Sequence, residues 1–188
     1  MQAKLIILSA PSGAGKTSIV KHLLDKVDKL KFSVSATNRP PRAGETDGVD
    51  YHFLSTEAFK RKIAENAFVE WEEVYAGQYY GTLKSAVNDE LTEGNHVIFD
   101  VDVIGGLNIK KEYGEQALAV FIKPPSPATL AERLRKRQSD SEKDIAKRLE
   151  KAEYELSFSD KFDLIIVNDD LERAREKCLN EVQKFLNQ

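Results

Sequence analysis

The sequence predicts an α/β fold in which helices cover both faces of a parallel sheet. Short, wholly apolar runs such as residues 5–8 (Leu-Ile-Ile-Leu) are typical of parallel strands that are buried on both faces. Amphipathic helical patterns alternate with these runs, and the first run ends in a glycine-rich turn. Because alternating strands and helices form parallel sheets with helices on either side, we expect that arrangement here.

The individual elements follow from hydrophobic periodicity. Buried strands are expected at residues 5–8, 97–100, 118–122 and 164–167. Helices are expected at residues 16–27 and at roughly 126–137, 145–158 and 170–186.

Two segments interrupt the alternation of strands and helices. Residues 33–85 are rich in polar, aromatic and turn residues and are predicted to be an insertion, whereas the charged residues 136–145 are predicted to be a mobile loop between helices.

Size and composition limit the partners that the chain can have. Its 188 residues suffice for one domain but not for two independent ones. The formal charge of −3 argues against a nucleic-acid-binding protein, which usually carries a basic excess. No apolar run reaches the ~20 residues that span a bilayer, so no membrane association is expected. The single cysteine, Cys178, excludes an intramolecular disulfide and suits a cytoplasmic protein. Nothing in the sequence sets the oligomeric state.

A phosphate-binding loop follows the first predicted strand. The pattern G-x-x-x-x-G-K-[ST] is matched by Gly15, Lys16 and Thr17, with Ala10 in place of the first glycine. Backbone N–H groups of residues 13–17 are expected to face the phosphates at the start of the next helix. Lys16 would bridge the β- and γ-phosphates, and the Thr17 hydroxyl would bind Mg²⁺. The strand before the loop and the helix after it disfavour a chance glycine-rich turn. The predicted ATP-binding residues of the loop are Ala10, Pro11, Ser12, Gly13, Ala14, Gly15, Lys16 and Thr17.

Two arginines flank a Pro-Pro pair at the start of the insertion. A Pro-Pro pair favours a polyproline-II backbone, which has ~3 residues per turn, so Arg39 and Arg42 project to the same side. Two guanidinium groups on a stiff backbone suit a phosphate dianion. Taken alone, however, the pair is more simply explained as a solvated basic turn.

The motifs from residue 35 to residue 82 resemble those of the guanylate kinase family. S-x-T-x-R-x-P-R-x-G-E, D-Y-x-F, F-V-E-W and Y-Y-G-T occur there in order, and the resemblance extends from about Lys4 to Phe185. It implies a P-loop nucleoside-monophosphate kinase fold in a single domain of residues 1–188. Within that domain it implies a GMP-binding insertion at about 33–85, a lid at about 136–145, and a core of about 1–32, 86–135 and 146–188.

The resemblance also implies the acceptor site. Ser35, Glu70 and Thr82 match the family's guanine-binding positions, and its GMP-phosphate contacts are matched by Arg39, Arg42, Tyr51 and Tyr80. The Glu70 carboxylate suits the N1–H and N2–H₂ donors of guanine, and the two hydroxyls can donate to O6. Adenine presents its donor and acceptor reversed, so a site built for guanine should reject it.

Further polar residues follow the later strands. Asp100 ends one strand and Asp102 lies two residues on, facing the same side. The resemblance assigns both to the GMP site and puts Asp100 near the guanine amino group and the Mg²⁺ water shell, two roles that the sequence does not separate. Asn168, in V-N-D, is implied to contact adenine, although Asn or Asp here is also typical of a helix N-cap. The implied lid arginines are Arg137 and Arg148, with Arg133 as a weaker third. Two positions depart from the family pattern. The family usually has glutamine at the position of Ile104 and commonly has glycine at the position of Gln138.

The reaction that the resemblance implies is ATP + GMP to ADP + GDP, with dGMP as a further acceptor. The acceptor phosphate has a second pKa near ~6 and needs no general base. Lys16, Arg39, Arg137 and Arg148, with Mg²⁺, would supply positive charge. Two alternatives stay open: a sugar-phosphate kinase of similar architecture, and a non-catalytic interaction module resembling guanylate kinase. The guanine-binding residues argue against the first, and the phosphate loop and lid arginines against the second.

Overall fold

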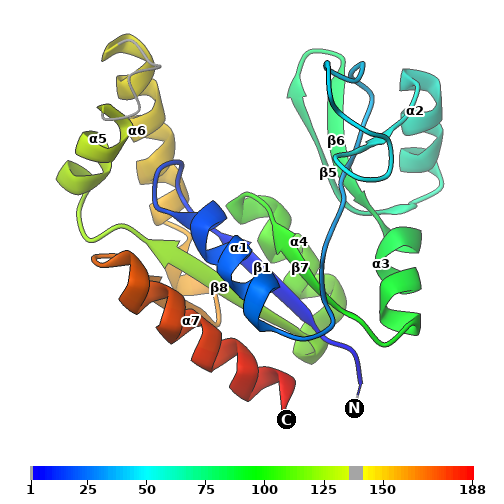
Figure 1. Ribbon diagram of the computed structural model, residues 1–188. Coiled ribbons are helices and arrows are strands. Elements are labelled where there is room, and N and C mark those ends of the chain that lie inside the picture. Colours follow the sequence, from blue (N-terminus) through cyan, green and yellow to red (C-terminus); the bar gives the residue numbers. More distant parts are fainter. Residues whose placement is uncertain (1, 136–141) are drawn as a thin grey trace.

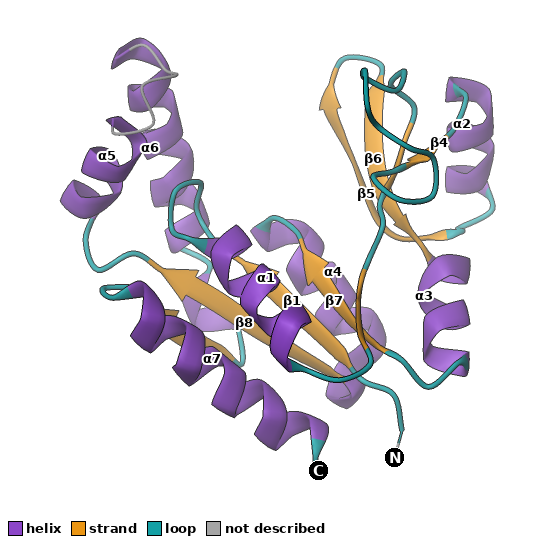
Figure 2. Cartoon of the chain, in the orientation of Figure 1, coloured by secondary structure: helices purple, strands orange, loops and turns teal. Residues whose placement is uncertain are grey.

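A five-stranded sheet forms the centre of the molecule (Figures 1 and 2). The computed structural model describes residues 2–135 and 142–188. The strand order is β2-β7-β1-β8-β9, and every neighbouring pair is parallel. The strands are β1 (Leu5–Ser9), β2 (Leu30–Phe32), β7 (His96–Asp100), β8 (Ala117–Lys123) and β9 (Leu164–Val167). The predicted parallel sheet is confirmed, and β2 is an edge strand that the apolar pattern did not indicate.

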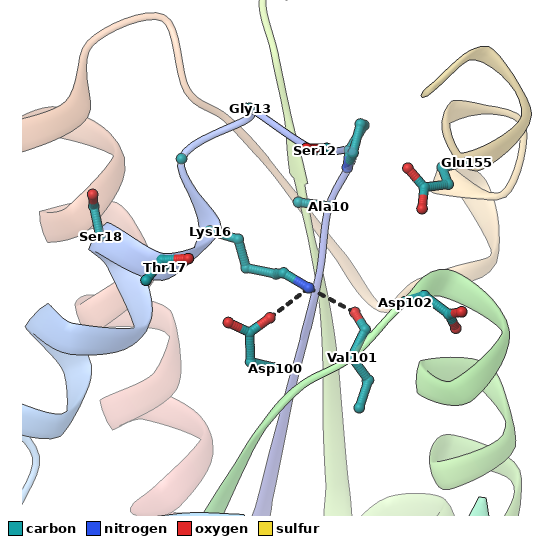
Figure 3. A pocket seen from close by; sticks show the side chains of 12 residues that line it. Ala10, Ser12, Gly13, Lys16, Thr17, Ser18, Asp100, Val101, Asp102 and Glu155 are labelled. Atoms are coloured by element: carbon teal, nitrogen blue, oxygen red, sulfur yellow. Dashed lines mark hydrogen bonds and ion pairs between the residues drawn. The ribbon is translucent and has the colours of Figure 1, made fainter. Parts of the chain in front are cut away.

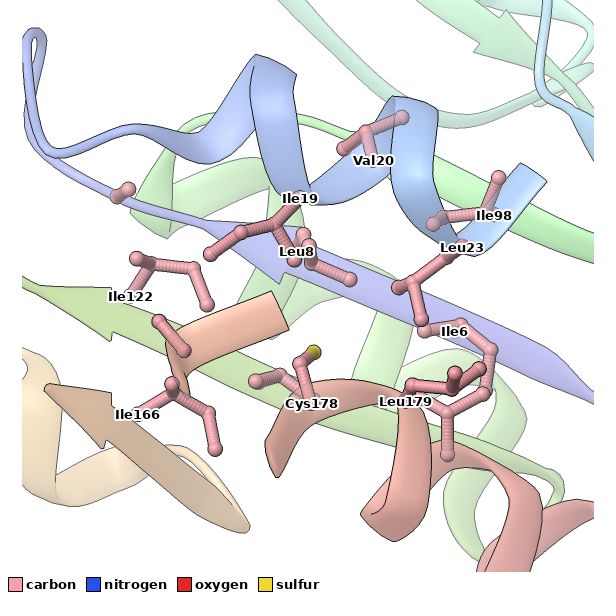
Figure 4. Packing of buried hydrophobic residues seen from close by; sticks show 14 of the residues in the cluster. Ile6, Leu8, Ile19, Val20, Leu23, Ile98, Ile122, Ile166, Cys178 and Leu179 are labelled. Carbon is pink, nitrogen blue, oxygen red and sulfur yellow. The ribbon is translucent and has the colours of Figure 1, made fainter. Parts of the chain in front are cut away.

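Helices cover both faces of this sheet, as predicted. Alternate residues of β1 enter two separate cores because side chains of a strand point to opposite faces. Ile6 and Leu8 pack with α1 (Lys16–Lys26) and α7 (Leu171–Leu186) (Figure 4). Leu5 and Ile7 pack on the other side with α4 (Val103–Tyr113) and Val87 of α3 (Lys84–Thr92). The short 3₁₀ turns are η1 (Gly114–Gln116) and η2 (Ser159–Lys161).

The predicted insertion contains a second sheet with a core of its own. Its strand order is β4-β3-β6-β5, with strands β3 (Ala36–Thr37), β4 (His52–Phe53), β5 (Phe68–Tyr75) and β6 (Gln78–Leu83). Helix α2 (Thr56–Ala64) is capped by Ser55, whose hydroxyl accepts the Ala58 N–H at 3.1 Å. The Phe59 ring of α2 stacks on the Phe68 ring of β5, with centroids 4.4 Å apart.

Two arms rise beyond the carboxyl ends of the central strands (Figure 1). One is the insertion; the other consists of α5 (Pro127–Arg135) and α6 (Glu142–Leu156). Because α6 begins at Glu142, residues 142–145 are helical and not part of the expected loop. The phosphate loop lies between the arms, at the edge of the sheet where α/β proteins bind ligands. Within the two described ranges, no helix is long and apolar enough to cross a membrane.

Candidate active site

The phosphate loop connects β1 to α1 and requires glycine at two positions. Gly13 has φ 92° and Gly15 has φ 98°, values that residues with a side chain rarely adopt. A Cβ atom on Gly15 would lie 2.2 Å from Asn168 Nδ2, and one on Gly13 would lie 3.1 Å from Leu134 Cδ2. The loop borders a cavity of about 340 Å³ that is also lined by Thr17, Asp100, Val101, Asp102 and Glu155.

One N–H group of the loop is already used within the loop. The Ala14 N–H donates to the Pro11 carbonyl at 3.0 Å, which closes a turn inside the loop. The expectation that every N–H from residue 13 to residue 17 faces the phosphates is therefore wrong at Ala14. At the start of α1 the Gly15 carbonyl accepts the Ser18 N–H at 3.2 Å.

Lys16 lies across the cavity, where two acceptors hold its ammonium group (Figure 3). Its Nζ is 2.5 Å from Asp100 Oδ1 and donates to the Val101 carbonyl at 2.8 Å. Asp100 reaches this position because it ends β7, which pairs in parallel with β1 and places Asp100 opposite Leu8. Lys16, which was predicted to bind the donor phosphates, is thus paired with Asp100, which was predicted to belong to the GMP site.

Two more acids line the same cavity. Asp102 caps α4, and its Oδ1 accepts the Gly105 N–H at 2.8 Å. Glu155 comes from α6 and is only 6% exposed, and this burial raises the pKa of its carboxyl group. Sequence reasoning missed Glu155, since it lies in a charged helix. The sequence did contain one indication of its role. Glu155 lies seven residues after Arg148, about two helical turns, so both side chains lie on one face of α6.

Glu70 and Thr82 face each other on neighbouring strands of the insertion. They are register partners of β5 and β6, and Thr82 Oγ1 donates to Glu70 Oε1 at 2.7 Å. Burial raises the pKa of Glu70, and the bond from Thr82 partly offsets that rise. A Cβ on Gly105 would lie 3.3 Å from Glu70 Oε2 and 3.4 Å from Asp102 Oδ1, so both acids adjoin the start of α4. The Thr82 hydroxyl proton, expected to go to guanine O6, is bonded to Glu70 here.

The predicted phosphate contacts of the insertion also lie together. The Arg39 guanidinium lies 4.9 Å from the centroid of the Tyr51 ring, and the ring centroids of Tyr51 and Tyr80 are 5.9 Å apart. Arg39 also forms a bidentate pair with Glu45, with Nη1–Oε2 and Nη2–Oε1 distances of 2.6 and 2.7 Å. Glu45 accepts the Arg42 N–H at 2.7 Å as well.

The charges in this cluster stabilise one another. The Arg39 guanidinium and the Arg42 N–H lower the pKa of Glu45 to about 2, and Glu45 raises the pKa of Arg39 in turn. The Arg42 side chain is exposed, and Ser35, two residues before Thr37 of β3, is half-buried. Sequence reasoning assigned no role to Glu45, although it is the final residue of the S-x-T-x-R-x-P-R-x-G-E motif.

Asn168 is in contact with the phosphate loop. It is 2% exposed, and its Nδ2 donates to the Ala14 carbonyl at 2.7 Å. Arg133 Nη2 of α5 donates to the Asn168 carbonyl at 2.9 Å. The alternative interpretation of residues 167–170 as a helix cap holds for Asp170, the residue after V-N-D, which accepts the Arg173 N–H at the start of α7.

The structure describes Ile104, one of the two departures from the family pattern, and Arg148, one of the two implied lid arginines. Ile104 is 42% exposed on α4, and Arg148 is half-buried on α6. Arg137 and Gln138 lie outside the described residues.

The cavity offers the oxygen ligands that Mg²⁺ prefers. The Thr17 hydroxyl and the Asp100 and Asp102 carboxylates line it. No group of three or more His, Cys, Asp or Glu side chains in the described part of the chain could hold a metal ion alone. That suits Mg²⁺, which commonly takes one or two protein oxygens and completes its shell with water and phosphates.

The chain is similar over its whole length to proteins of one family. The family model described as guanylate kinase matches residues 2–188. Guanylate kinase of Bacteroides fragilis is 53% identical over 185 residues, which cover 98% of this chain and 91% of that protein. Guanylate kinase of Chlorobaculum tepidum is 50% identical over 187 residues, covering 100% of this chain and 95% of that protein.

Solved structures give the same answer. The crystal structure of guanylate kinase from Anaplasma phagocytophilum superposes with a TM-score of 0.72 at 29% sequence identity, covering 97% of this chain and 85% of that one. The expected P-loop nucleoside-monophosphate kinase fold is thereby confirmed. With a family model across nearly its whole length and relatives at about half identity, the chain belongs to the guanylate kinase family.

Proposed function

We propose that this protein transfers the γ-phosphoryl group of ATP to GMP, giving ADP and GDP, with dGMP as a second acceptor. The observation that carries the choice of acceptor is the buried Glu70 carboxylate, held by Thr82 at 2.7 Å. It lies in the same insertion as the Arg39 cluster. The insertion thus combines an acid that can recognise a base with a cluster that can bind a phosphate, and this combination suits a nucleoside monophosphate.

The base would be read by complementary hydrogen bonds. The ionised Glu70 carboxylate would accept from guanine N1–H and N2–H₂, and Asp102, which adjoins Gly105 as Glu70 does, would accept from the same amino group. Thr82 then acts by orienting Glu70, and Ser35 supplies the hydroxyl that donates to O6. Adenine would leave buried polar groups unpaired, and such mismatches discriminate by several powers of ten.

The acceptor phosphate would be held by Arg39, Arg42, Tyr51 and Tyr80. Arg39 is already oriented by Glu45 and by the Tyr51 ring, so little side-chain freedom is left to lose when the phosphate binds. Arg42 is exposed and free to turn toward the phosphate. The hydroxyl groups of the two tyrosines complete the donor set.

On the donor side, residues 10–17 would bind the ATP phosphates and Asn168 would lie on the ATP side. Lys16 would leave Asp100 and Val101 for the β- and γ-phosphates, since its flexible stem allows the ammonium to swing. Thr17, with Asp100 close by, would hold Mg²⁺ partly through water. When bound, Mg²⁺ would neutralise part of the negative charge of the donor phosphates.

Catalysis would consist of alignment and charge stabilisation. The acceptor phosphate is largely a dianion at neutral pH, so no general base is required. Lys16, Arg39, Arg137 and Arg148 would surround the transferring group with positive charge. We further propose that residues 33–85 and the lid at about 136–145 close over a core of about 1–32, 86–135 and 146–188, excluding water that would hydrolyse ATP. The reaction suits a cytoplasmic enzyme that acts on small molecules, without nucleic acid or membrane.

A coupled assay tests this function. ADP formation would be followed with GMP, dGMP, AMP, UMP and ribose bisphosphate as acceptors, each with Mg²⁺-ATP. GMP and dGMP should support turnover, and AMP should be worse by at least roughly 10²-fold in kcat/KM. Turnover with ribose bisphosphate instead would favour a sugar-phosphate kinase, and no turnover with any acceptor would favour a non-catalytic module.

A further inference from the structure

One peptide unit of the phosphate loop is held from outside the loop. The unit joins Ala14 to Gly15, and its carbonyl accepts from Asn168 Nδ2 at 2.7 Å. No peptide bond in the described residues is cis, so the carbonyl and the N–H of this planar unit point in opposite directions. Fixing the Ala14 carbonyl toward Asn168 therefore fixes the Gly15 N–H away from it.

The direction away from Asn168 is the direction of the cavity. Gly13, Gly15 and Lys16 line the cavity, whereas Ala14 and Asn168 are not among the lining residues. The Gly15 N–H is thus placed for a phosphate oxygen, whereas the Ala14 N–H is occupied by Pro11 at 3.0 Å.

The local sequence does not hold this orientation. Gly15 has φ 98°, and glycine tolerates φ of either sign, so Gly15 itself imposes no steric barrier to rotation of the Ala14–Gly15 peptide. The Ala14 carbonyl is buried with its residue, and a buried carbonyl needs a partner. Asn168 supplies that partner at very close range, since a Cβ on Gly15 would lie 2.2 Å from its amide nitrogen.

Asn168 is itself fixed in place. Its backbone N–H donates to the Lys123 carbonyl at 2.8 Å, and its own carbonyl accepts from Arg133 at 2.9 Å. The asparagine is therefore tied to the end of β8 and to helix α5, and its side chain is 2% exposed.

We propose that Asn168 is a positioning residue that locks the Ala14–Gly15 peptide so that the Gly15 N–H faces the donor phosphates. This role is separate from any contact with adenine. It rests on the proposed function only in that the loop binds donor phosphates. Loss of this positioning should therefore weaken even the binding of a ligand that has phosphates and no base.

The test is calorimetry with inorganic triphosphate and with ATP, each with Mg²⁺ and without GMP. Asn168→Ala should weaken both ligands by the same factor, roughly 10-fold or more, as expected for one lost hydrogen bond to a charged group. Asn95→Ala is the matched control, because Asn95 Nδ2 also donates at 2.7 Å, to Glu90, but lies remote from the loop in the turn before β7. This control should bind both ligands as the wild type does.

A loss of ATP affinity with normal triphosphate affinity in Asn168→Ala would overturn the proposal, since it would put Asn168 at the adenine alone. Unchanged affinity for both ligands would overturn it as well. Because no acceptor and no turnover are involved, these outcomes are independent of whether GMP is the substrate.

Nuclear magnetic resonance of the wild type covers the case in which the variant does not fold. Triphosphate should move the Gly15 amide proton downfield by more than that of Ala14. The Asn168 side-chain amide should exchange with solvent far more slowly than that of Asn180, which is exposed. An unmoved Gly15 amide, or exchange at Asn168 as fast as at Asn180, would overturn the proposal.

Discussion

Replacing Glu70 by glutamine should separate guanine recognition from stability. The substitution keeps the shape of the side chain but turns one acceptor oxygen into a donor that faces the donors of guanine. One hydrogen bond to a charged group, about 1.5–3 kcal/mol, is lost, and an unpaired buried donor costs about 1–3 kcal/mol more. The sum of about 2.5–6 kcal/mol corresponds to a rise in the KM for GMP of roughly 10²–10⁴-fold.

The same variant should be no less stable than the wild type at pH 7. Burial raises the pKa of Glu70, so the folded state binds its proton more tightly than the unfolded state does. The free energy of unfolding of the wild type therefore falls as pH rises from the usual carboxyl pKa through the raised one. Glutamine lacks this penalty, so Glu70→Gln should melt at an equal or higher temperature at pH 7. Its advantage should vanish below the usual carboxyl pKa.

Steady-state kinetics with GMP and with AMP, calorimetry with ATP, and thermal melts from pH 4 to pH 8 would measure these effects. ATP affinity serves as the internal control and should not change. An unaltered preference for GMP over AMP would refute the base-reading role. A melting temperature well below that of the wild type at pH 7 would refute the argument from burial.

Three further predictions concern the phosphate loop and the core. Lys16→Met should lower the rate of transfer by at least roughly 10²–10³-fold while leaving GMP affinity intact, and near-normal turnover would contradict the charge assigned to Lys16. Gly15→Ala should cost about 1–3 kcal/mol of stability through strain at φ 98° and should weaken ATP binding by more than Asn168→Ala does, because the new Cβ displaces Asn168 and also strains the loop; melts and calorimetry with ATP would show it. Burial raises the pKa of the Cys178 thiol to about 12, so a thiol reagent at pH 8 should label the unfolded chain and spare the folded one; rapid labelling of the folded protein would contradict the packing of α7.

The parts of the fold that rest on local pattern were predictable from the sequence. The strand expected at residues 5–8 is β1 (Leu5–Ser9), and the helix expected at 170–186 is α7 (Leu171–Leu186). The strand is a wholly apolar run, and the helix is long enough for its helical period to be clear. Helix α4 was not predicted, because Gly105 and Gly106 weaken its helical character. It forms because Asp102 caps it and because Val103 and Ile109 are buried against the sheet.

Other features depend on contacts that no local pattern carries. Strands β3 and β4 have two residues each and therefore show no period. The strand order β2-β7-β1-β8-β9 is set by which apolar faces meet across the sheet. The same holds within the candidate site. The bond from Asn168 to Ala14 joins residues 154 apart in the chain. The motif residues of the insertion, by contrast, could be identified from their order alone.

The inert core thiol makes this chain well suited to distance measurements in solution. Cys178 is the single cysteine and is 0% exposed, packed between α7 and the central sheet (Figure 4). A cysteine introduced on the outer surface of α2 and another on α6 would therefore be the reactive thiols available to a spin label, with no need to remove the natural one. A pair of labels on the two arms would report their separation in the free protein and with each substrate, so that the movement of each arm could be assigned to the ligand that causes it.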